Sequence, residues 1–342
     1  MMARENDSYS KSTGPQKEVV LGQLSFGKLV FLCIIALALG VVGPLSIFAP
    51  LPLAVAFLLY GLKRTFLVSG LLAGITYGVS MSAPGYEMLS HYAFMMVGSV
   101  IFAVAISSII MRGENPVKGL ISRGILIFGV LVALVGLTAL VSPEPLTVQV
   151  EKLVVTGFEQ IKNQPNYLEI MKAGGEPARD LEAFLSKPKE LVNAVFESVF
   201  AVTFVGVFFV LWLTLFMLLR NGMIWREMHD YRFGLKDLVR FKAPDFLMYF
   251  VILGFALFIG GEYLGGKSLE VVGANILWSL GVFYFFQGMG IYLDLLKFLK
   301  ITGLLRSILT VMTIFLAFRF VAIVGLFDLW ADFRKYFKRK EN

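Results

Sequence analysis

The chain has 342 residues, of which 57% are hydrophobic and only 16% are charged, and its formal net charge at pH 7 is +7. A mean hydropathy of +0.77 excludes an ordinary soluble domain and predicts an integral membrane protein. Its long uncharged runs favour transmembrane helices over a β-barrel, whose strands would alternate polar and apolar residues. Because basic residues in such proteins set topology, we expect no nucleic-acid partner.

The residue inventory argues against disulfide, metal and catalytic sites. Cys33 is the single cysteine, and His91 and His229 stand far apart without a nearby cysteine or acidic cluster. Zinc-protease, Walker and Rossmann motifs are absent, and Gly78 to Ser82 only half resembles a nucleophile elbow. An intramembrane enzyme would rest on that weak pattern alone. We therefore expect no metal, no cofactor and no enzymatic activity.

In chain order, a polar N-terminal tail is followed by a first group of spans. The tail lacks the features of a cleaved signal peptide and is predicted to be cytoplasmic. Between Leu29 and Tyr60 the apolar run is cut by glycine and proline, which predicts two short helices that meet at a proline-rich turn. Three more spans are expected at Phe66 to Ser82, Tyr92 to Met111 and Ile121 to Val141.

The middle of the chain changes character. Residues 143–192 carry mixed charges, prolines and short amphipathic stretches, which predict an external helical segment. From Pro188 to Leu219 the sequence predicts one helix of about 48 Å, longer than the ~30 Å hydrocarbon layer, so it should protrude and carry that segment. The basic, aromatic loop RNGMIWREMHDYRFGLKDLVRFKAPD follows. It is either a topology signal in contact with lipid headgroups or a docking surface for a partner.

The C-terminal spans begin at Pro244, which suits the first turn of a helix running from Phe246 to Gly260. A second helix returns through Ala274 to Lys300. The stretch from Ile308 to Leu326 is either one span, which leaves the basic tail outside, or two shorter helices hinged near Arg319, which bring it inside. The charge rule favours the second arrangement.

The predicted fold is all-α, a polytopic transmembrane bundle of eight or nine membrane segments with an external helical cap. Basic residues after alternate spans predict a protein of the bacterial cytoplasmic membrane whose N-terminus is on the cytoplasmic side. The predicted regions are a tail (1–26), an N-terminal bundle (27–142), the external segment (143–192) and a C-terminal bundle with a basic tail (193–342).

Small residues at four-residue spacing predict close helix packing in two places. Gly70, Gly74 and Gly78 put a bare stripe on one face of a span, and internal packing is the favoured interpretation. Ala36 and Gly40 repeat the spacing on the first helix, where an internal and an intermolecular contact both stay open.

Polar side chains within the last long span raise a question about what they face. Asn275, Ser279 and Gln287 share a broad sector of one helix, which should face protein or a cavity, because an unpaired amide is unfavourable in hydrocarbon. Either they form interhelical hydrogen bonds, or they are the polar wall of a ligand pocket, with Trp278 and Tyr284 as amphipathic partners.

Arg319 is a second candidate, because a charge at depth in a membrane marks a functional site by default if it finds a counter-ion. Asp328, Asp332 and Asp294 are the available acids. The alternative is that Arg319 snorkels to an interface or makes a purely structural ion pair.

Four stretches of the C-terminal half resemble the YybS-like family of uncharacterised bacterial membrane proteins. They are FKAPD from Phe241, NILW from Asn275, YFFQGMGI from Tyr284 and VGLFDLWADFR from Val324. That family is distantly similar to the S components of energy-coupling-factor vitamin transporters. The resemblance implies a pocket that opens toward the outside. It also implies that small residues in an A-x-x-x-A arrangement on the first helix contact a coupling subunit. Ala36 and Gly40 occupy these two positions here, with Gly in place of the second Ala. The external segment and the extra C-terminal spans depart from a six-helix S component.

Two functions are consistent with these patterns. The first is a non-enzymatic component of a transporter-like assembly that binds a small molecule or lipid and takes energy from a partner, since the chain has no ATPase motif. The second is a membrane scaffold that holds a larger complex and has no pocket. In both, the expected partners are membrane lipids and other membrane or membrane-associated proteins.

Overall fold

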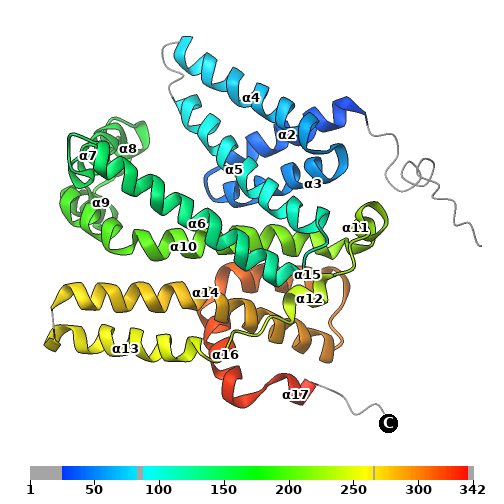
Figure 1. Ribbon diagram of the computed structural model, residues 1–342. Coiled ribbons are helices and arrows are strands. Elements are labelled where there is room, and N and C mark those ends of the chain that lie inside the picture. The colour runs from blue at the N-terminus through cyan, green and yellow to red at the C-terminus, as the bar shows by residue number, and fades with distance from the viewer. Residues whose placement is uncertain (1–24, 83–87, 265, 338–342) are drawn as a thin grey trace, which may run out of the picture. The chain divides into compact units, whose positions relative to one another are not determined.

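The computed structural model describes residues 25–82, 88–264 and 266–337, and every regular element in these ranges is a helix (Figure 1). In these ranges six helices are long and apolar enough to cross a membrane, and one bent helix pair would make a seventh. Two further helices are apolar but shorter. These findings confirm the all-α polytopic prediction. The predicted tail, residues 1–26, lies almost entirely outside the described residues.

The helices divide into two compact units, neither of which is one continuous segment. The first unit, residues 1–123 and 208–240, is called the N-terminal unit, and the second, residues 124–207 and 241–342, the C-terminal unit. Two long helices, α6 (Pro116–Val141) and α10 (Pro188–Arg220), run from one unit into the other. The length of α10, 33 residues, confirms the prediction of a single long helix.

The N-terminal unit begins with the predicted pair of short helices. This pair is α2 (Phe26–Val41) and α3 (Pro50–Tyr60), and the other elements are the 3₁₀ helix η1 (Gly43–Phe48) between them, α4 (Leu62–Ser82), α5 (Met88–Met111), α11 (Gly222–His229) and α12 (Leu235–Val239). Pro44 falls in the first turn of η1 and Pro50 starts α3, where a missing backbone N–H does no harm. Side chains such as Leu53, Phe57 and Ile106 fill the core between α3 and α5.

The C-terminal unit is built around α14. Its elements are α7 (Leu146–Lys162), α8 (Pro165–Ala173), α9 (Glu176–Leu185), α13 (Leu247–Leu264), α14 (Lys267–Phe298), α15 (Gly303–Leu316), α16 (Phe318–Ala331) and α17 (Arg334–Phe337). Figure 1 shows α13 and α14 side by side as an antiparallel pair. Helices α7 to α9 are the predicted amphipathic pieces, and Phe158 and Leu185 are among their buried side chains.

One helix start differs from the prediction. Pro244 does not lie in the first turn of α13, which begins at Leu247. The Pro244 carbonyl instead accepts the Leu247 N–H at 3.0 Å in a preceding turn. The physical reason is that the Ala243 N–H is bound at 2.8 Å by the side chain of Gln287, which holds this loop along α14.

The predicted hinge near Arg319 is present. Helix α15 ends at Leu316, α16 begins at Phe318, and the two axes differ by 92°. Phe318 stacks on Phe285 of α14 with ring centroids 4.3 Å apart, and this contact turns α16 onto α14.

The prediction that the glycine stripe of α4 packs internally is wrong. Gly70, Gly74 and Gly78 are exposed, and a Cβ placed on any of them would meet no atom within 4 Å in the described residues. Helix α4 packs instead through the side that carries Thr65, whose hydroxyl donates to the Ala56 carbonyl at 3.1 Å, and Val68. The four-residue spacing marked a bare face correctly but could not say which face meets a neighbour.

The small residues of α2 do lie at a helix contact. Ala36 is buried, and a Cβ on Gly40 would stand 3.9 Å from the Cβ of Met95 in α5. At Ala36 the internal contact therefore holds.

Candidate functional site

The sequence-predicted candidates on α14 are engaged separately rather than around one cavity. Asn275 faces α10, where its Oδ1 accepts the Ala201 N–H at 2.9 Å and its Nδ2 donates to the Glu197 carbonyl at 2.6 Å. Glu197 and Ala201 are four residues apart, so the amide matches the donor and the acceptor of one turn of α10. A salt bridge of 2.5 Å between Lys267 and Glu197 joins the same two helices.

Replacing Asn275 with leucine is therefore expected to lower the free energy of unfolding by about 1 to 2 kcal/mol, the usual scale for interhelical hydrogen bonds in membranes. Thermal or SDS-induced unfolding of the purified protein measures this. The matched control is Asn166→Leu, because Asn166 is an exposed residue of α8. Equal effects of the two changes would show that the Asn275 bonds contribute nothing.

Gln287 is the most deeply buried of the candidates, with no exposed surface. Its Oε1 accepts the Ala243 N–H at 2.8 Å and its Nε2 donates to Asp328 Oδ2 at 2.8 Å. The other oxygen of Asp328 accepts the Phe333 N–H at 2.8 Å. One amide therefore joins the loop before α13, the middle of α14 and the end of α16.

An arginine and a second carboxylate extend this cluster. Arg334 Nε lies 3.8 Å from Asp294 Oδ2, and its Nη2 donates to the carbonyls of Phe241 and Gln287 at 3.5 and 3.4 Å. We call Gln287, Asp328, Asp294 and Arg334 the polar centre. The polar centre joins three segments that are far apart in the sequence: the loop at Phe241, the middle of α14 and the end of α16 with Arg334.

These contacts agree with the first of the two interpretations of the amides. Asn275 and Gln287 both face protein, and their hydrogen bonds are the interhelical ones that the first interpretation predicts. Ser279 and Tyr284 are buried, and neither hydroxyl has a hydrogen-bond partner in the described residues. Trp278, the other predicted amphipathic partner of that wall, is 51% exposed. The predicted polar wall is therefore not assembled.

The expected counter-ions of Arg319 are also wrong. Arg319 is exposed and has no carboxylate partner in the described part of the chain. Its guanidinium carbon lies 5.6 Å from the centroid of the Trp278 indole. The 92° bend directs the start of α16 toward the first half of α14, whereas Asp294 and Asp328 are held in the polar centre. The exposed Asp332 follows the far end of α16.

The sequence matches the family described as Predicted membrane protein (DUF2232) over residues 29–329. The chain belongs to this family. No curated protein and no solved structure matches it. The DUF2232 match includes α14, the hinge and Asp328, and it also covers most of the N-terminal unit.

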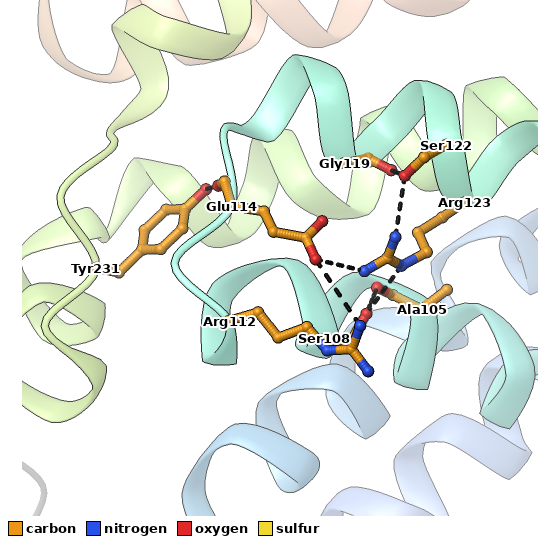
Figure 2. A network of polar contacts seen from close by, with 8 residues as sticks. All are labelled: Ala105, Ser108, Arg112, Glu114, Gly119, Ser122, Arg123 and Tyr231. Carbon is orange, nitrogen blue, oxygen red and sulfur yellow. Dashed lines mark hydrogen bonds and ion pairs between the residues drawn. The ribbon is translucent and has the colours of Figure 1, made fainter.

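A second polar network of this DUF2232 protein lies in the N-terminal unit, in the turn between α5 and α6 (Figure 2). Glu114 accepts a bond of 2.7 Å from Arg123 Nη2 and lies 4.0 Å from Arg112 Nη1. Arg123 Nε also donates to Ser108 Oγ at 3.2 Å. Sequence reasoning missed this network because it interpreted charges at span ends only as topology signals.

Tyr231 connects this turn to the basic loop after α10. Its hydroxyl donates to the Glu114 carbonyl at 3.1 Å (Figure 2). Burial raises the pKa of the Tyr231 phenol, and the carboxylates of Asp237 and Glu114 add to the rise. The phenol is thus a stable donor at every physiological pH. No group of three or more potential metal-ligating side chains occurs within the described ranges.

Proposed function

We propose that this protein is a non-enzymatic component of a transporter-like assembly and that it binds an amphiphile with an anionic group at Arg319 and Trp278. The observation that carries this proposal is an arginine that lies over an indole and has no carboxylate partner in the described residues. Its surroundings are apolar, since Leu316 is 76% and Phe320 73% exposed. An arginine on an apolar membrane surface is stable only when an anion or water satisfies it.

The chemistry of the pair defines the class of ligand. A guanidinium binds phosphate or carboxylate through two parallel hydrogen bonds. Stacking over Trp278 orients the guanidinium plane and leaves its N–H groups available. The exposed apolar side chains on both sides of Arg319 suit an acyl or isoprenoid chain. A lipid or small amphiphile with a phosphate or carboxylate head fits all three features.

Lipid-dependent melting tests the proposal. In neutral detergent, added phosphatidylglycerol is expected to raise the melting temperature of the wild-type protein more than phosphatidylcholine does, because an anion bound only to the folded state stabilises it. Arg319→Gln should weaken the apparent affinity about tenfold, the loss expected for one charge-assisted contact. Arg179→Gln is the control, since Arg179 is an exposed arginine of α9. An equal lipid response in wild type and Arg319→Gln would refute the site.

A scaffold without a pocket is the second candidate. The hydrogen-bonded states of Asn275 and Gln287 favour it, because protein already occupies the sector in which a pocket was expected. In that case no lipid or small molecule raises the melting temperature selectively, and a partner co-purifies in fixed ratio.

The distribution of basic residues bears on the orientation of the protein in the membrane. Basic residues lie at the ends of alternate helices, for example Lys28 at the start of α2, Arg112 after α5 and Arg220 at the end of α10. This pattern supports a cytoplasmic N-terminus in the bacterial inner membrane. The relation to S components of vitamin transporters belongs to the proposal as well; the buried state of Ala36 speaks against a coupling-subunit contact at that residue.

A further inference from the structure

The basic loop after α10 is a folded surface with a fixed backbone path. We call residues 220–240, which include α11 and α12, the basic segment. Trp225 Nε1 donates to the Leu218 carbonyl at 2.7 Å, and His229 Nε2 is 2.9 Å from the Leu58 carbonyl of α3. Tyr231 binds the α5–α6 turn at 3.1 Å. Three hydrogen bonds from large side chains therefore fix the segment to the rest of the N-terminal unit.

The charged side chains of the basic segment are exposed, whereas its anchors are not. Trp225, Tyr231 and Leu238 are buried. The charged side chains between and beside them are all exposed: Arg226, Glu227, Asp230, Arg232, Lys236, Asp237 and Arg240. Met223 is 77% exposed on the same segment. The result is a rigid surface with an excess of basic groups, interspersed acidic groups and one protruding apolar side chain.

A topology signal does not require this construction. The positive-inside rule depends on the number of lysines and arginines near a span and not on their fixed positions. Anionic lipid headgroups are also a poor match. Each basic residue near an anionic surface is worth about 1 kcal/mol, and the three interspersed acids of the segment would offset much of that attraction.

We propose that the basic segment is the docking surface for a protein partner whose contacting face is mainly acidic. Proteins recognise one another through complementary charge patterns on shaped surfaces, and arginine and methionine are enriched in such interfaces. Met223 would be the apolar anchor, and Arg226, Arg232, Lys236 and Arg240 would pair with carboxylates. This inference uses other residues than the Arg319 site and goes beyond the proposed function.

Site-specific photo-crosslinking in the full-length protein tests the inference. The photo-reactive amino acid p-benzoylphenylalanine replaces Met223, and in a control protein it replaces Leu168, an exposed residue of α8. After irradiation of native membranes, a protein cross-linked from position 223 and not from position 168 is identified, purified and titrated against the purified chain in neutral-lipid nanodiscs.

The partner is expected to bind more weakly at high salt. In the Arg232→Glu/Lys236→Glu variant its affinity should fall by roughly tenfold or more. Reversal of the facing acidic residues of the partner should restore it. Tyr231→Phe, which removes an anchor and no charge, should weaken binding to a smaller extent. Unchanged melting temperatures show that the variants fold.

Three outcomes would overturn the inference. Cross-links only to lipid would show that the basic segment contacts the bilayer surface and not a protein. Cross-links only to a second copy of the chain would make the segment a self-association surface. If the affinity of the purified partner is the same with and without the two charge reversals, the charges do not define the interface.

Discussion

Replacing Gly325 with alanine is expected to lower the free energy of unfolding by about 3 kcal/mol, the upper range for overpacking a close contact. A Cβ on Gly325 of α16 would overlap the Tyr284 carbonyl of α14, and a Cβ on Gly288 would overlap the Val321 carbonyl. Both obstacles are backbone atoms, which cannot rotate away. The two helices can cross at this distance only because both positions are glycine.

Gly281→Ala is the control for this experiment, because a Cβ at Gly281 of α14 meets nothing within 4 Å. It should leave stability unchanged or raise it by up to about 1 kcal/mol, since alanine favours the helix more than glycine does. SDS titration of the purified variants measures both effects. If Gly325→Ala were as stable as Gly281→Ala, the close crossing of α14 and α16 would be disproved.

Replacing Gln287 with leucine is expected to reduce stability by about 2 to 4 kcal/mol, because the change leaves two buried groups without their partner. These groups are the Ala243 N–H and one oxygen of Asp328. The same substitution at Gln160, an exposed residue of α7, is the control. Chemical unfolding followed by tryptophan fluorescence is a suitable measurement.

A double-mutant cycle separates this effect from a simple change in packing. Gln287→Leu and Asp328→Leu should be less harmful together than the sum of the single changes, with a coupling free energy of at least about 1 kcal/mol. Strict additivity would mean that Gln287 and Asp328 do not interact in the folded protein.

Helix positions were the part of the fold that sequence reasoning predicted best. Proline and glycine between Val42 and Pro50 predicted the break between α2 and α3, because these residues interrupt a continuous helix. The single helix α10 followed from its uninterrupted apolar run, and the break at Ala317 followed from the charge of the tail. Each inference depended on local chemistry or on one-dimensional charge balance.

Neighbour relations were harder, because a face of a helix does not specify what covers it. The stripe at Gly70, Gly74 and Gly78 satisfies the pattern for close packing and yet is exposed. The close crossing of α14 and α16 instead uses Gly288 and Gly325, which have no glycine four residues away. The acids offered to Arg319 were chosen for closeness in sequence. Arg319 is at the start of α16 and Asp328 nine residues further along the same helix, and Asp328 and Asp294 pair with Gln287 and Arg334 instead.

That the two amides hydrogen-bond to protein was predicted from the sequence, but the helices and loops that supply their partners were not. Their need for protein partners followed from the energy of a buried amide, and both Asn275 and Gln287 have such partners. Those partners belong to α10 and to the loop at Ala243, which no periodicity connects to α14.

The interleaved order of the two units has a consequence for biosynthesis. When a ribosome has released residues 1–207, the early helices still lack Trp212, His229 and Tyr231, and the later unit lacks α13 to α17. The Leu58 carbonyl of α3 and the Glu114 carbonyl of the α5–α6 turn therefore lack their partners His229 and Tyr231 until α10 and the basic segment have been synthesised. Completion of the N-terminal unit therefore requires that α10 and the basic segment are in place.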